Sequence, residues 1–454
     1  MVRKVYMVSG GVSKFTKARK DKTFQAIVKE AYDYTVSNLK IPRKEIHQRI
    51  EATTASYFSD HFTRQLMAGI MVQDYLGLIP KPSKRIEGGG ATGGLNFQTA
   101  YESIASERFG LVLAYGFETM SHVNTWKGNE FIALASDVSF DYPVGGFYSG
   151  YYAQMCVRHM YEFGTTVEQL AYVSIKNHRN AMFNPYAQKS GRLTVQDVRK
   201  AQMVAWPLTR LDICVMSDGA AAVLLADEDT AFELTDTPIE ITGVGTGTDA
   251  MRMADRPHKD VLLLPHEKTE DYIGERFVGG KLNYPGIHSF RAGRMAAIEA
   301  YKNAKITDPL KQIDFAEVHD AYTSSELQTI EDLGFCKYGE SGKFTEEGNT
   351  FMPGIDYGLD LPKQGTIPVN PSGGLIACGH PVGATGLMQA VFAFWQLQGT
   401  IKKHFVAAGM SEEKASVLQL NNPKRGLIHS HAGTGTYVTV SILERPKDVE
   451  IVDQ

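Results

Sequence analysis

The spacing of apolar residues predicts alternating helices and strands along the first half of the chain. Residues 23–39 and 63–78 have the spacing of amphipathic helices. Residues 83–121 run as strand, glycine turn, helix and strand, with helical apolar positions at Leu95, Phe97, Ala100, Ile104 and Ala105. Residues 218–228, DGAAAVLLADE, predict a further apolar strand. This alternation is typical of an α/β protein with a parallel or mixed sheet.

The second half repeats the same order of elements. IEITGVGTGTDA (239–250) is similar to KVYMVSGGVSKF near the N-terminus, and residues 370–397 again open a long apolar helix with a glycine turn. GTGTYVTVSILER (433–445) corresponds to the strand at 218–228. The period of roughly 230 to 280 residues is far longer than a solenoid repeat, so we predict two similar α/β halves packed together.

Two stretches interrupt this symmetry and suggest the domain boundaries. Residues 122–205 are rich in Tyr, Phe and Asn, and residues 337–365 are rich in glycine and charge. Long insertions of this kind are usually functional. We therefore predict an N-terminal half at 1–121 plus 206–235, an inserted domain at 122–205, and a C-terminal half at 236–454 that carries the 337–365 insertion.

Composition narrows the class of protein. The 454 residues are 43% hydrophobic and 22% charged, with a net charge of −4, which gives no reason to expect nucleic acid or an anionic membrane as partner. The four cysteines form no CxxC pair, so we expect free thiols and no zinc site. The N-terminus lacks a signal-peptide pattern and no apolar run is long enough to span a bilayer, so a cytoplasmic protein is expected.

The segment CGHPVGATG (378–386) contains the first candidate catalytic residue. His380 precedes a proline, which places it on an extended turn, and Gly383 and Gly386 let a helix begin close to another backbone. An imidazole at such a helix start can donate to an oxyanion or take a proton. A structural turn histidine is the alternative for an isolated GHP, but the preceding NPSGGL favours a functional site.

Two more segments place polar side chains beside predicted strands. In VHDAYTSSEL, a strand leads into His319, Asp320 and Tyr322, and a helix follows from Thr323. The end of a strand in an α/β sheet suits a site, although a helix N-cap role for Asp320 or Thr323 is equally compatible. GLIHSHAGTGTYVTV places two histidines two residues apart before a glycine turn, but no third ligand with matching spacing supports a metal site.

The segments VNPSGGLIACGHPVGATGLMQAVFAFWQLQG, EVHDAYTSSELQTIEDLGFC, YVSIKNHRNAMFNPYAQ and HSHAGTG resemble, in order, motifs of the thiolase superfamily. The similarity is closest to the sterol-carrier-protein-type and archaeal-type thiolases. It implies a five-layered α/β/α/β/α sandwich of two duplicated halves, usually a dimer. It also implies that the inserted loop domain covers the substrate and helps to bind coenzyme A.

The chain departs from the family at the nucleophile. The family carries its cysteine in a C-A-S/T-G turn, and EGGGATGG (87–94) has Gly90 at that position. Glycine offers no nucleophile for an acyl-enzyme. The C-terminal acid/base cysteine of many members corresponds to His429, as in the archaeal type. The cysteine that follows His-Asp in the sterol-carrier type is replaced by Ala321, with Tyr322 after it.

The resemblance leaves an oxyanion-binding apparatus. It implies that His319 and His380 stabilise a thioester enolate, and that main-chain N–H groups at Gly90 and near His431 form a second oxyanion hole. Asn370, the first residue of NPSGGL, belongs to the same expected site.

Three functions are compatible with these residues. The first is a thiolase-type acyltransferase whose missing thiol reflects a substitution or another nucleophile such as Cys378. The second is a cysteine-independent acyl-CoA aldolase or retro-aldolase with Tyr322 as acid/base; related aldolases lack the cysteine but also lack GHP, which this chain keeps. The third is a non-catalytic subunit that binds CoA esters.

The remaining expectations concern ligands and partners. A CoA thioester is the expected substrate, without a tightly bound cofactor. Arg252, Arg256 and Lys259 could meet its phosphates, or they could form a solvated charged loop. A homodimer is expected, and the resemblance adds a small zinc-ribbon/OB-fold protein as a partner. The aromatic residues Tyr148, Tyr151, Tyr152 and Phe183 suit either a roomy apolar pocket or the core of the loop domain.

Overall fold

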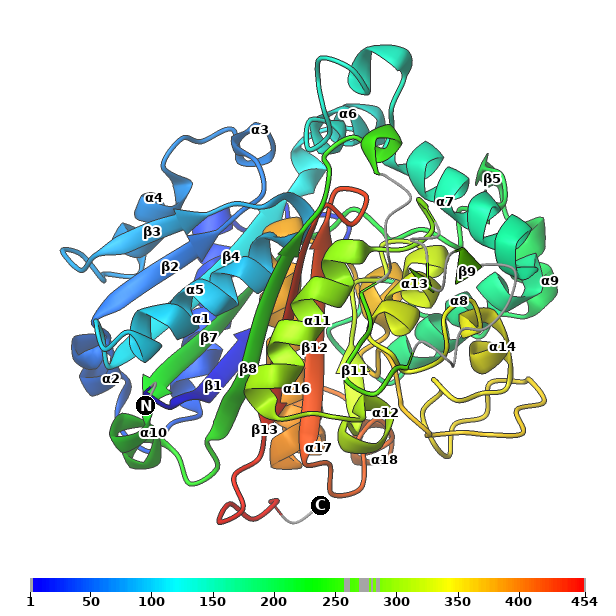
Figure 1. Ribbon diagram of the computed structural model, residues 1–454. Coiled ribbons are helices and arrows are strands. Elements are labelled where there is room, and N and C mark those ends of the chain that lie inside the picture. Colours follow the sequence, from blue (N-terminus) through cyan, green and yellow to red (C-terminus); the bar gives the residue numbers. More distant parts are fainter. Residues whose placement is uncertain (1–2, 257–261, 269–276, 279–280, 283–285, 453–454) are drawn as a thin grey trace.

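The computed structural model describes residues 3–256, 262–268, 277–278, 281–282 and 286–452 (Figure 1). Within these residues, the largest sheet has nine strands in the order β11-β12-β13-β8-β1-β7-β4-β2-β3. Its strands are β1 (Val5–Val12), β2 (Ala52–Ser56), β3 (Ser83–Ile86), β4 (Leu111–Thr119), β7 (Asp218–Asp227), β8 (Ile239–Thr248), β11 (Phe315–Glu317), β12 (Arg425–Ala432) and β13 (Tyr437–Glu444). Two short ribbons lie outside it: β5 (Met203–Ala205) with β6 (Leu208–Thr209), and β9 (Phe277–Val278) with β10 (Lys281–Leu282).

The sheet is mixed, and its two ends have related strand arrangements. At one end β2 pairs with β3 and β4 in parallel, and β7 runs antiparallel to both β4 and β1. At the other end β11 pairs with β12 in parallel, and β13 runs antiparallel to both β12 and β8. A short antiparallel pairing of β1 with β8 joins the two. The predicted mixed α/β sheet is therefore confirmed.

The helices and the two ends of the sheet together form five layers. Helices α5 (Thr92–Ala105) and α16 (Val382–Gln398) contact each other and strands of both ends of the sheet. Helix α1 (Phe24–Ser37) packs on β1, β4 and β7, and α11 (Arg291–Ala304) packs on β8 and β13 (Figure 1). The alternating glycines of β8 permit this last contact, since a Cβ on Gly245 would lie 2.1 Å from the carbonyl oxygen of Ala296. The expected α/β/α/β/α sandwich is confirmed.

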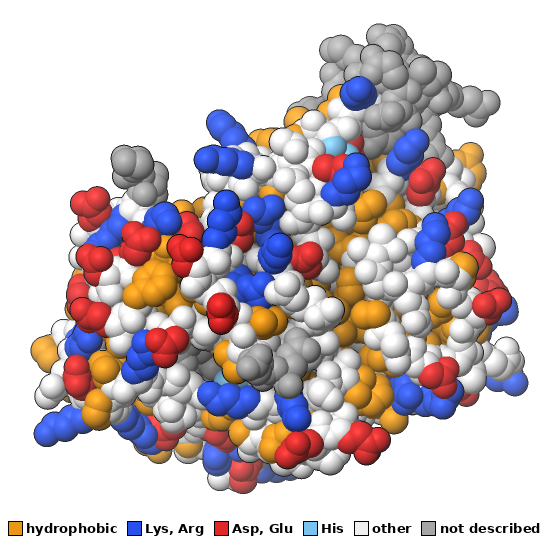
Figure 2. Space-filling view, turned by 90° about the horizontal axis from the view of Figure 1, so that it is seen from below, with side chains coloured by type: hydrophobic (Ala, Val, Ile, Leu, Met, Phe, Trp, Pro, Cys, Tyr) orange, Lys and Arg blue, Asp and Glu red, His pale blue; other side chains and the backbone are white. Residues whose placement is uncertain are grey.

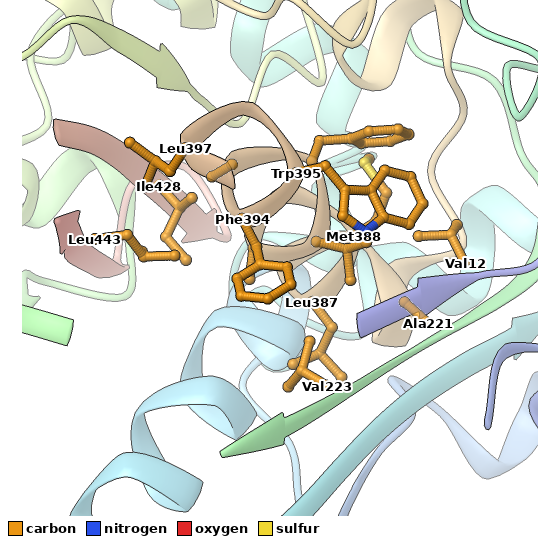
Figure 3. Packing of buried hydrophobic residues seen from close by; sticks show 14 of the residues in the cluster. Val12, Ala221, Val223, Leu387, Met388, Phe394, Trp395, Leu397, Ile428 and Leu443 are labelled. Atoms are coloured by element: carbon orange, nitrogen blue, oxygen red, sulfur yellow. The ribbon is translucent and has the colours of Figure 1, made fainter. Parts of the chain in front are cut away.

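Helix α16 forms the centre of the core. Every residue from Val382 to Gln398 is buried, which explains why the helix carries no charged side chain. In Figure 3 its Leu387, Met388, Phe394, Trp395 and Leu397 lie among side chains of strands from both ends of the sheet, namely Val12, Ala221, Val223, Ile428 and Leu443. Only Pro381 separates His380 from the first residue of this buried helix, so the core fixes the place of the GHP segment.

The segment at 122–205 lies beyond one end of the sheet (Figure 1). It contains α6 (Thr125–Ala133), α7 (Tyr148–Phe163), α8 (Val167–Ala181) and α9 (Val195–Lys200). A reciprocal pair of hydrogen bonds between Thr166 and Gln169 caps the start of α8. The domain boundaries given above remain a prediction.

Among the described helices, none has the length and apolar character needed to cross a membrane.

One of the predicted helices differs in the structure. The predicted helix at 63–78 is wrong in its extent, because the structure has α3 (Asp60–Thr63) and α4 (Ala68–Tyr75) instead. Arg64 and Met67 adopt left-handed backbone angles, with φ of 54° and 55°, and these angles break the helix. The other helices are α2 (Arg43–Arg49), α10 (Glu228–Leu234), α12 (Pro309–Gln312), α13 (Thr323–Asp332), α14 (Ser341–Glu346), α15 (Gly374–Ala377), α17 (Ile401–Ala407) and α18 (Glu412–Ala415).

Candidate functional site

The glycine turn between β3 and α5 packs directly against the end of β12. Gly89 has a left-handed φ of 55°, and Thr92 Oγ1 closes the turn by donating to the Gly89 carbonyl oxygen at 2.6 Å. A Cβ placed on Gly90 would lie 2.5 Å from the carbonyl oxygen of His431 and 3.2 Å from Cε1 of His319. Gly90 is therefore at the site, in contact range of two of the expected residues, with no space for a side chain.

Four imidazoles converge beside this turn. The ring centroid of His319, which follows β11, lies 5.0 Å from that of His380 and 4.3 Å from that of His431. The ring centroids of His429 and His431 are 5.6 Å apart, and the main-chain N–H of His319 donates to His429 Nδ1 at 3.4 Å. Residues from three distant parts of the chain thus meet at the tip of α5.

Burial keeps these imidazoles neutral. It lowers the pKa of His380 and of His429 to about 3. The pKa of His319 and that of His431 also fall well below the usual range, first through burial and then through neighbouring histidines. A neutral imidazole has one N–H donor and one lone pair, so each ring can donate to an oxyanion or accept a proton, depending on its tautomer.

Hydrogen bonds orient two of the rings. His380 Nδ1 lies 2.7 Å from Thr385 Oγ1 on the first turns of α16. His431 Nε2 lies 2.5 Å from the Tyr152 hydroxyl. By contrast, Nδ1 of His319 and Nδ1 of His431 are buried and have no hydrogen-bond partner among the described residues. These two atoms belong to adjacent rings, whose centroids are 4.3 Å apart, so both could bond the same polar ligand.

Two stacked tyrosines form one wall of the site. The rings of Tyr152, on α7, and Tyr322 are 4.1 Å apart at 19°. The Tyr152 hydroxyl also donates to the Gly433 carbonyl oxygen at 3.0 Å, and the Tyr322 hydroxyl lies 3.3 Å from Ser149 Oγ. Burial raises the pKa of both phenols, so both are protonated at neutral pH. The sequence suggests Tyr152 only as an aromatic residue of a pocket or of the loop-domain core, and not as one of the catalytic residues.

Asn370 and Asp320 lie behind the imidazoles and support the loop that carries them. Asn370 Oδ1 accepts from the main-chain N–H of Val318, and its Nδ2 donates to Glu326 at 2.8 Å. Glu326 also pairs at 2.9 Å with Lys176, and both side chains are wholly buried. Asp320 accepts from the main-chain N–H of Leu375 at 2.6 Å. Tyr322 is the N-cap residue of α13, so the alternative in which Asp320 or Thr323 caps that helix is wrong.

The expected phosphate-binding residues have protein partners in this structure. Arg252 Nε donates to Asp137 Oδ2 at 2.6 Å, and its side chain is 37% exposed. Arg256 is buried, and its guanidinium donates to the carbonyl and hydroxyl oxygens of Thr434. Arg256 therefore fastens the turn that follows β12. Lys259 lies outside the described residues.

The cysteines do not offer a ready nucleophile. Burial raises the pKa of all four thiols, Cys156, Cys214, Cys336 and Cys378, so little thiolate exists at neutral pH. Cys214 lies beside the Tyr322 loop, because its main-chain N–H donates to the Ala321 carbonyl oxygen at 2.9 Å. Among the described residues, no group of three or more His, Cys, Asp or Glu side chains could hold a metal ion.

Comparison with known proteins shows clear relatives. A family model described as "Thiolase C-terminal domain-like" matches residues 284–445. The chain is 37% identical over 384 residues to the acetyl-CoA acetyltransferase of Methanothermobacter thermautotrophicus, and the match covers 85% of each chain. It is 29% identical over 419 residues to human sterol carrier protein 2, covering 89% of this chain and 68% of that protein.

Solved structures share the fold. The "Ltp2-ChsH2(DUF35) aldolase" superimposes with a TM-score of 0.73 at 21% identity, covering 98% of each chain. Human mitochondrial 3-ketoacyl-CoA thiolase superimposes with a TM-score of 0.64 at 16% identity, covering 98% of this chain and 99% of that one.

Proposed function

Because the chain belongs to the thiolase superfamily, we propose that it makes or breaks a carbon–carbon bond next to a CoA thioester without forming an acyl-cysteine. The reaction is an aldol or retro-aldol step. A 3-hydroxyacyl-CoA is cleaved to a shorter acyl-CoA and an aldehyde or ketone, or is formed from them. The thioester enolate is the species that the site must stabilise.

The contact between Gly90 and β12 carries this proposal. By resemblance, Gly90 occupies the position of the family's nucleophile, and a Cβ there would come within 2.5 Å of the His431 carbonyl oxygen. Atoms held that close repel strongly, so any side chain requires the backbone to shift. An aldol step needs no thioester exchange, and the absence of a thiol at this position therefore leaves its chemistry intact.

The imidazoles supply the enolate-binding role. We assign His319 and His380 as donors to the thioester oxygen, where negative charge develops. Each such donor contributes about 3 to 4 kcal/mol in enzymes where one has been removed. The main-chain N–H groups of Gly90 and His431 form the second oxyanion hole, while His429 and Asn370 hold the His319 segment in place. Tyr322, which is protonated at neutral pH because burial raises its pKa, donates a hydrogen bond from its hydroxyl to the β-oxygen.

Substrate and partners follow the same proposal. The 122–205 segment covers an acyl-CoA, and Arg252 reaches a CoA phosphate by exchanging its bond to Asp137. A homodimer forms through the edge of the sheet beside β3. A small zinc-ribbon/OB-fold protein is a further partner. The aldolase of similar fold is itself named together with a second component, ChsH2(DUF35), which supports a hetero-oligomer.

A thiolase-type acyltransferase is the second candidate. The 37% identity to a protein named acetyl-CoA acetyltransferase favours it. This function needs a nucleophile from elsewhere, and Cys214 beside Ala321 is the cysteine that the structure places next to the Tyr322 loop. The two candidates differ in whether free CoA is a co-substrate.

The deciding experiment uses two substrates. The purified protein is given 3-hydroxy-3-phenylpropionyl-CoA without free CoA, and separately acetoacetyl-CoA with free CoA. We expect benzaldehyde and acetyl-CoA from the first and no thiolysis of the second. The Tyr322→Phe variant should lose the cleavage, whereas Tyr161→Phe, at an 81% exposed position of α7, should keep it. Thiolysis without aldol cleavage would establish the acyltransferase. If the protein catalyses neither reaction, the remaining candidate is a non-catalytic subunit that binds CoA esters.

A further inference from the structure

The side chain of His431 has an arrangement that the proposed enolate binding does not use. Its Nε2 lies 2.5 Å from the Tyr152 hydroxyl, and the Tyr152 hydroxyl donates to the Gly433 carbonyl oxygen. Its Nδ1 is buried and has no hydrogen-bond partner among the described residues. One ring nitrogen is therefore anchored, and the other has no partner within the described residues.

The hydrogen bonds of Tyr152 determine where the His431 proton lies. A phenol has a single proton, and this one is directed to the Gly433 carbonyl oxygen at 3.0 Å. The phenol oxygen consequently accepts a proton from Nε2–H of His431. In this tautomer Nδ1 carries a lone pair, and the ring stands 4.3 Å from His319 between centroids. The basic nitrogen of His431 therefore lies next to an imidazole that we assign to enolate binding.

A retro-aldol step needs such a base. The hydroxyl proton of the substrate must leave as the carbon–carbon bond breaks, and Tyr152 and Tyr322 hold their own protons at neutral pH because burial raises the pKa of both. His431 is neutral, since burial and the nearby His429, His380 and Arg256 all disfavour its charged form. Its lone pair is free to accept.

We propose that the His431 imidazole is the proton acceptor for the substrate hydroxyl and that Tyr152 is the positioning residue that fixes its tautomer. This inference rests on the proposed function. The hydroxyl proton passes to His431 Nδ1, the Cα–Cβ bond breaks, and its electron pair forms the thioester enolate beside His319 and His380. The same proton then returns from Nδ1 to Cα. No other reactant is required, and the products are an acyl-CoA and an aldehyde or ketone.

The surroundings favour proton transfer to a ring that is otherwise hard to charge. The imidazolium that forms would keep its Nε2–H bonded to the Tyr152 oxygen, and the enolate oxygen provides an opposite charge nearby. A base whose second nitrogen is held by a third group is the arrangement found in catalytic triads. Tyr152 comes from the inserted segment and His431 from β12, so the base is correctly oriented only when these elements are packed together.

The test compares His431→Gln and Tyr152→Phe with the control Tyr161→Phe on the same helix. Tyr152→Phe keeps the ring that stacks on Tyr322 and removes only the hydroxyl. We expect His431→Gln to lower kcat about 10²- to 10⁴-fold with KM changed little, and to abolish the acid limb of the pH profile. Tyr152→Phe should lower kcat about 10-fold and displace that limb. Added imidazole should partly restore a His431→Gly variant.

A second measurement separates this inference from the proposed function. Exchange of the α-protons of acetyl-CoA in D₂O reports enolate formation without any carbonyl partner. The base assignment is supported if the wild type exchanges these protons and His431→Gln does not. The circular dichroism spectrum of His431→Gln must show that the variant still folds. Equal exchange or cleavage rates and equal pH profiles in wild type and His431→Gln would overturn the inference alone. If the wild type shows neither exchange nor cleavage, the proposed function itself is wrong and the inference falls with it.

Discussion

The carbonyl oxygen of His431 lies 2.5 Å from the point where a Cβ on Gly90 would stand. The two residues come from opposite ends of the sheet, and their contact brings the glycine turn against β12. This distance is far below ordinary van der Waals separation, so the geometry is one that only glycine satisfies without movement. Glycine at position 90 is therefore required by the close packing of the turn against His431. Adding a side chain at position 90 would displace the strand that carries two of the histidines.

The Gly90→Cys variant should therefore not recover thiolase activity. We expect it to lower the free energy of unfolding by about 1 to 3 kcal/mol, as overpacking does, and to weaken aldol cleavage because the turn and β12 must separate. Gly90→Ala is the matched control, because it adds the same Cβ without the thiol. Urea unfolding and assays with acetoacetyl-CoA and free CoA provide the measurements. A gain of thiolysis specific to cysteine would favour the acyltransferase.

Replacing Cys214 should leave the reaction largely intact. Its thiol lies beside the Tyr322 loop, but burial raises its pKa to about 12, so it is a thiol and not a thiolate at neutral pH. We expect Cys214→Ala to retain kcat within about 3-fold and to cost about 1 kcal/mol of stability, since only a small group is removed. Cys378→Ala serves as a second buried thiol control. Complete loss of turnover in Cys214→Ala alone would identify it as a nucleophile.

The sequence predicts the histidines of this site better than the tyrosine that orients one of them. His319 and His380 stand next to strand ends, glycines and a proline, whose conformational demands mark the loops of a site. Tyr152 lies inside α7, where an aromatic residue at helical spacing is equally typical of a core. Its partner His431 is 279 positions away, and nothing local signals their contact.

Other features of the fold were similarly hidden from local patterns. The break between α3 and α4 depends on left-handed angles at Arg64 and Met67, which neither residue type favours. The bonds from Arg256 to Thr434 could not be inferred from a charged loop segment, because they depend on how β12 and the segment after β8 pack together. Periodicity predicts elements, whereas these contacts arise from tertiary packing.

His404 should make stability depend on pH. Its ring is buried, stacks 4.1 Å from Trp395, and lies 2.7 Å from the Tyr34 hydroxyl through Nδ1. Burial lowers its pKa to about 3, against about 6.5 in an unfolded chain. The unfolded state then binds more protons between these values. The stability that neutral His404 contributes is present above about pH 6.5 and is lost as the pH falls toward 3.

The comparison of wild type with His404→Gln isolates this effect from other titrating groups. We expect the difference in unfolding free energy to shrink by up to about 1.4 kcal/mol for each unit of pH below 6.5. Guanidinium unfolding at pH 7.5, 6.5 and 5.5 measures it. A difference that stays constant over this range would show that His404 does not titrate as its burial requires.

The edge of the sheet at β3 should form a dimer interface. Within the described residues β3 has a strand partner on one side only, and α4 packs beside it. In the turn immediately before α4, Leu66 is 73% exposed and Met67 is 68% exposed. Edge strands and apolar patches of this kind favour association.

We expect the wild type to sediment as a dimer and Met67→Asp to sediment as a monomer with an unchanged circular dichroism spectrum. Val406→Asp, at a partly exposed position on α17, should remain dimeric. A monomeric wild type, or dimers in all three proteins, would exclude this surface as the interface.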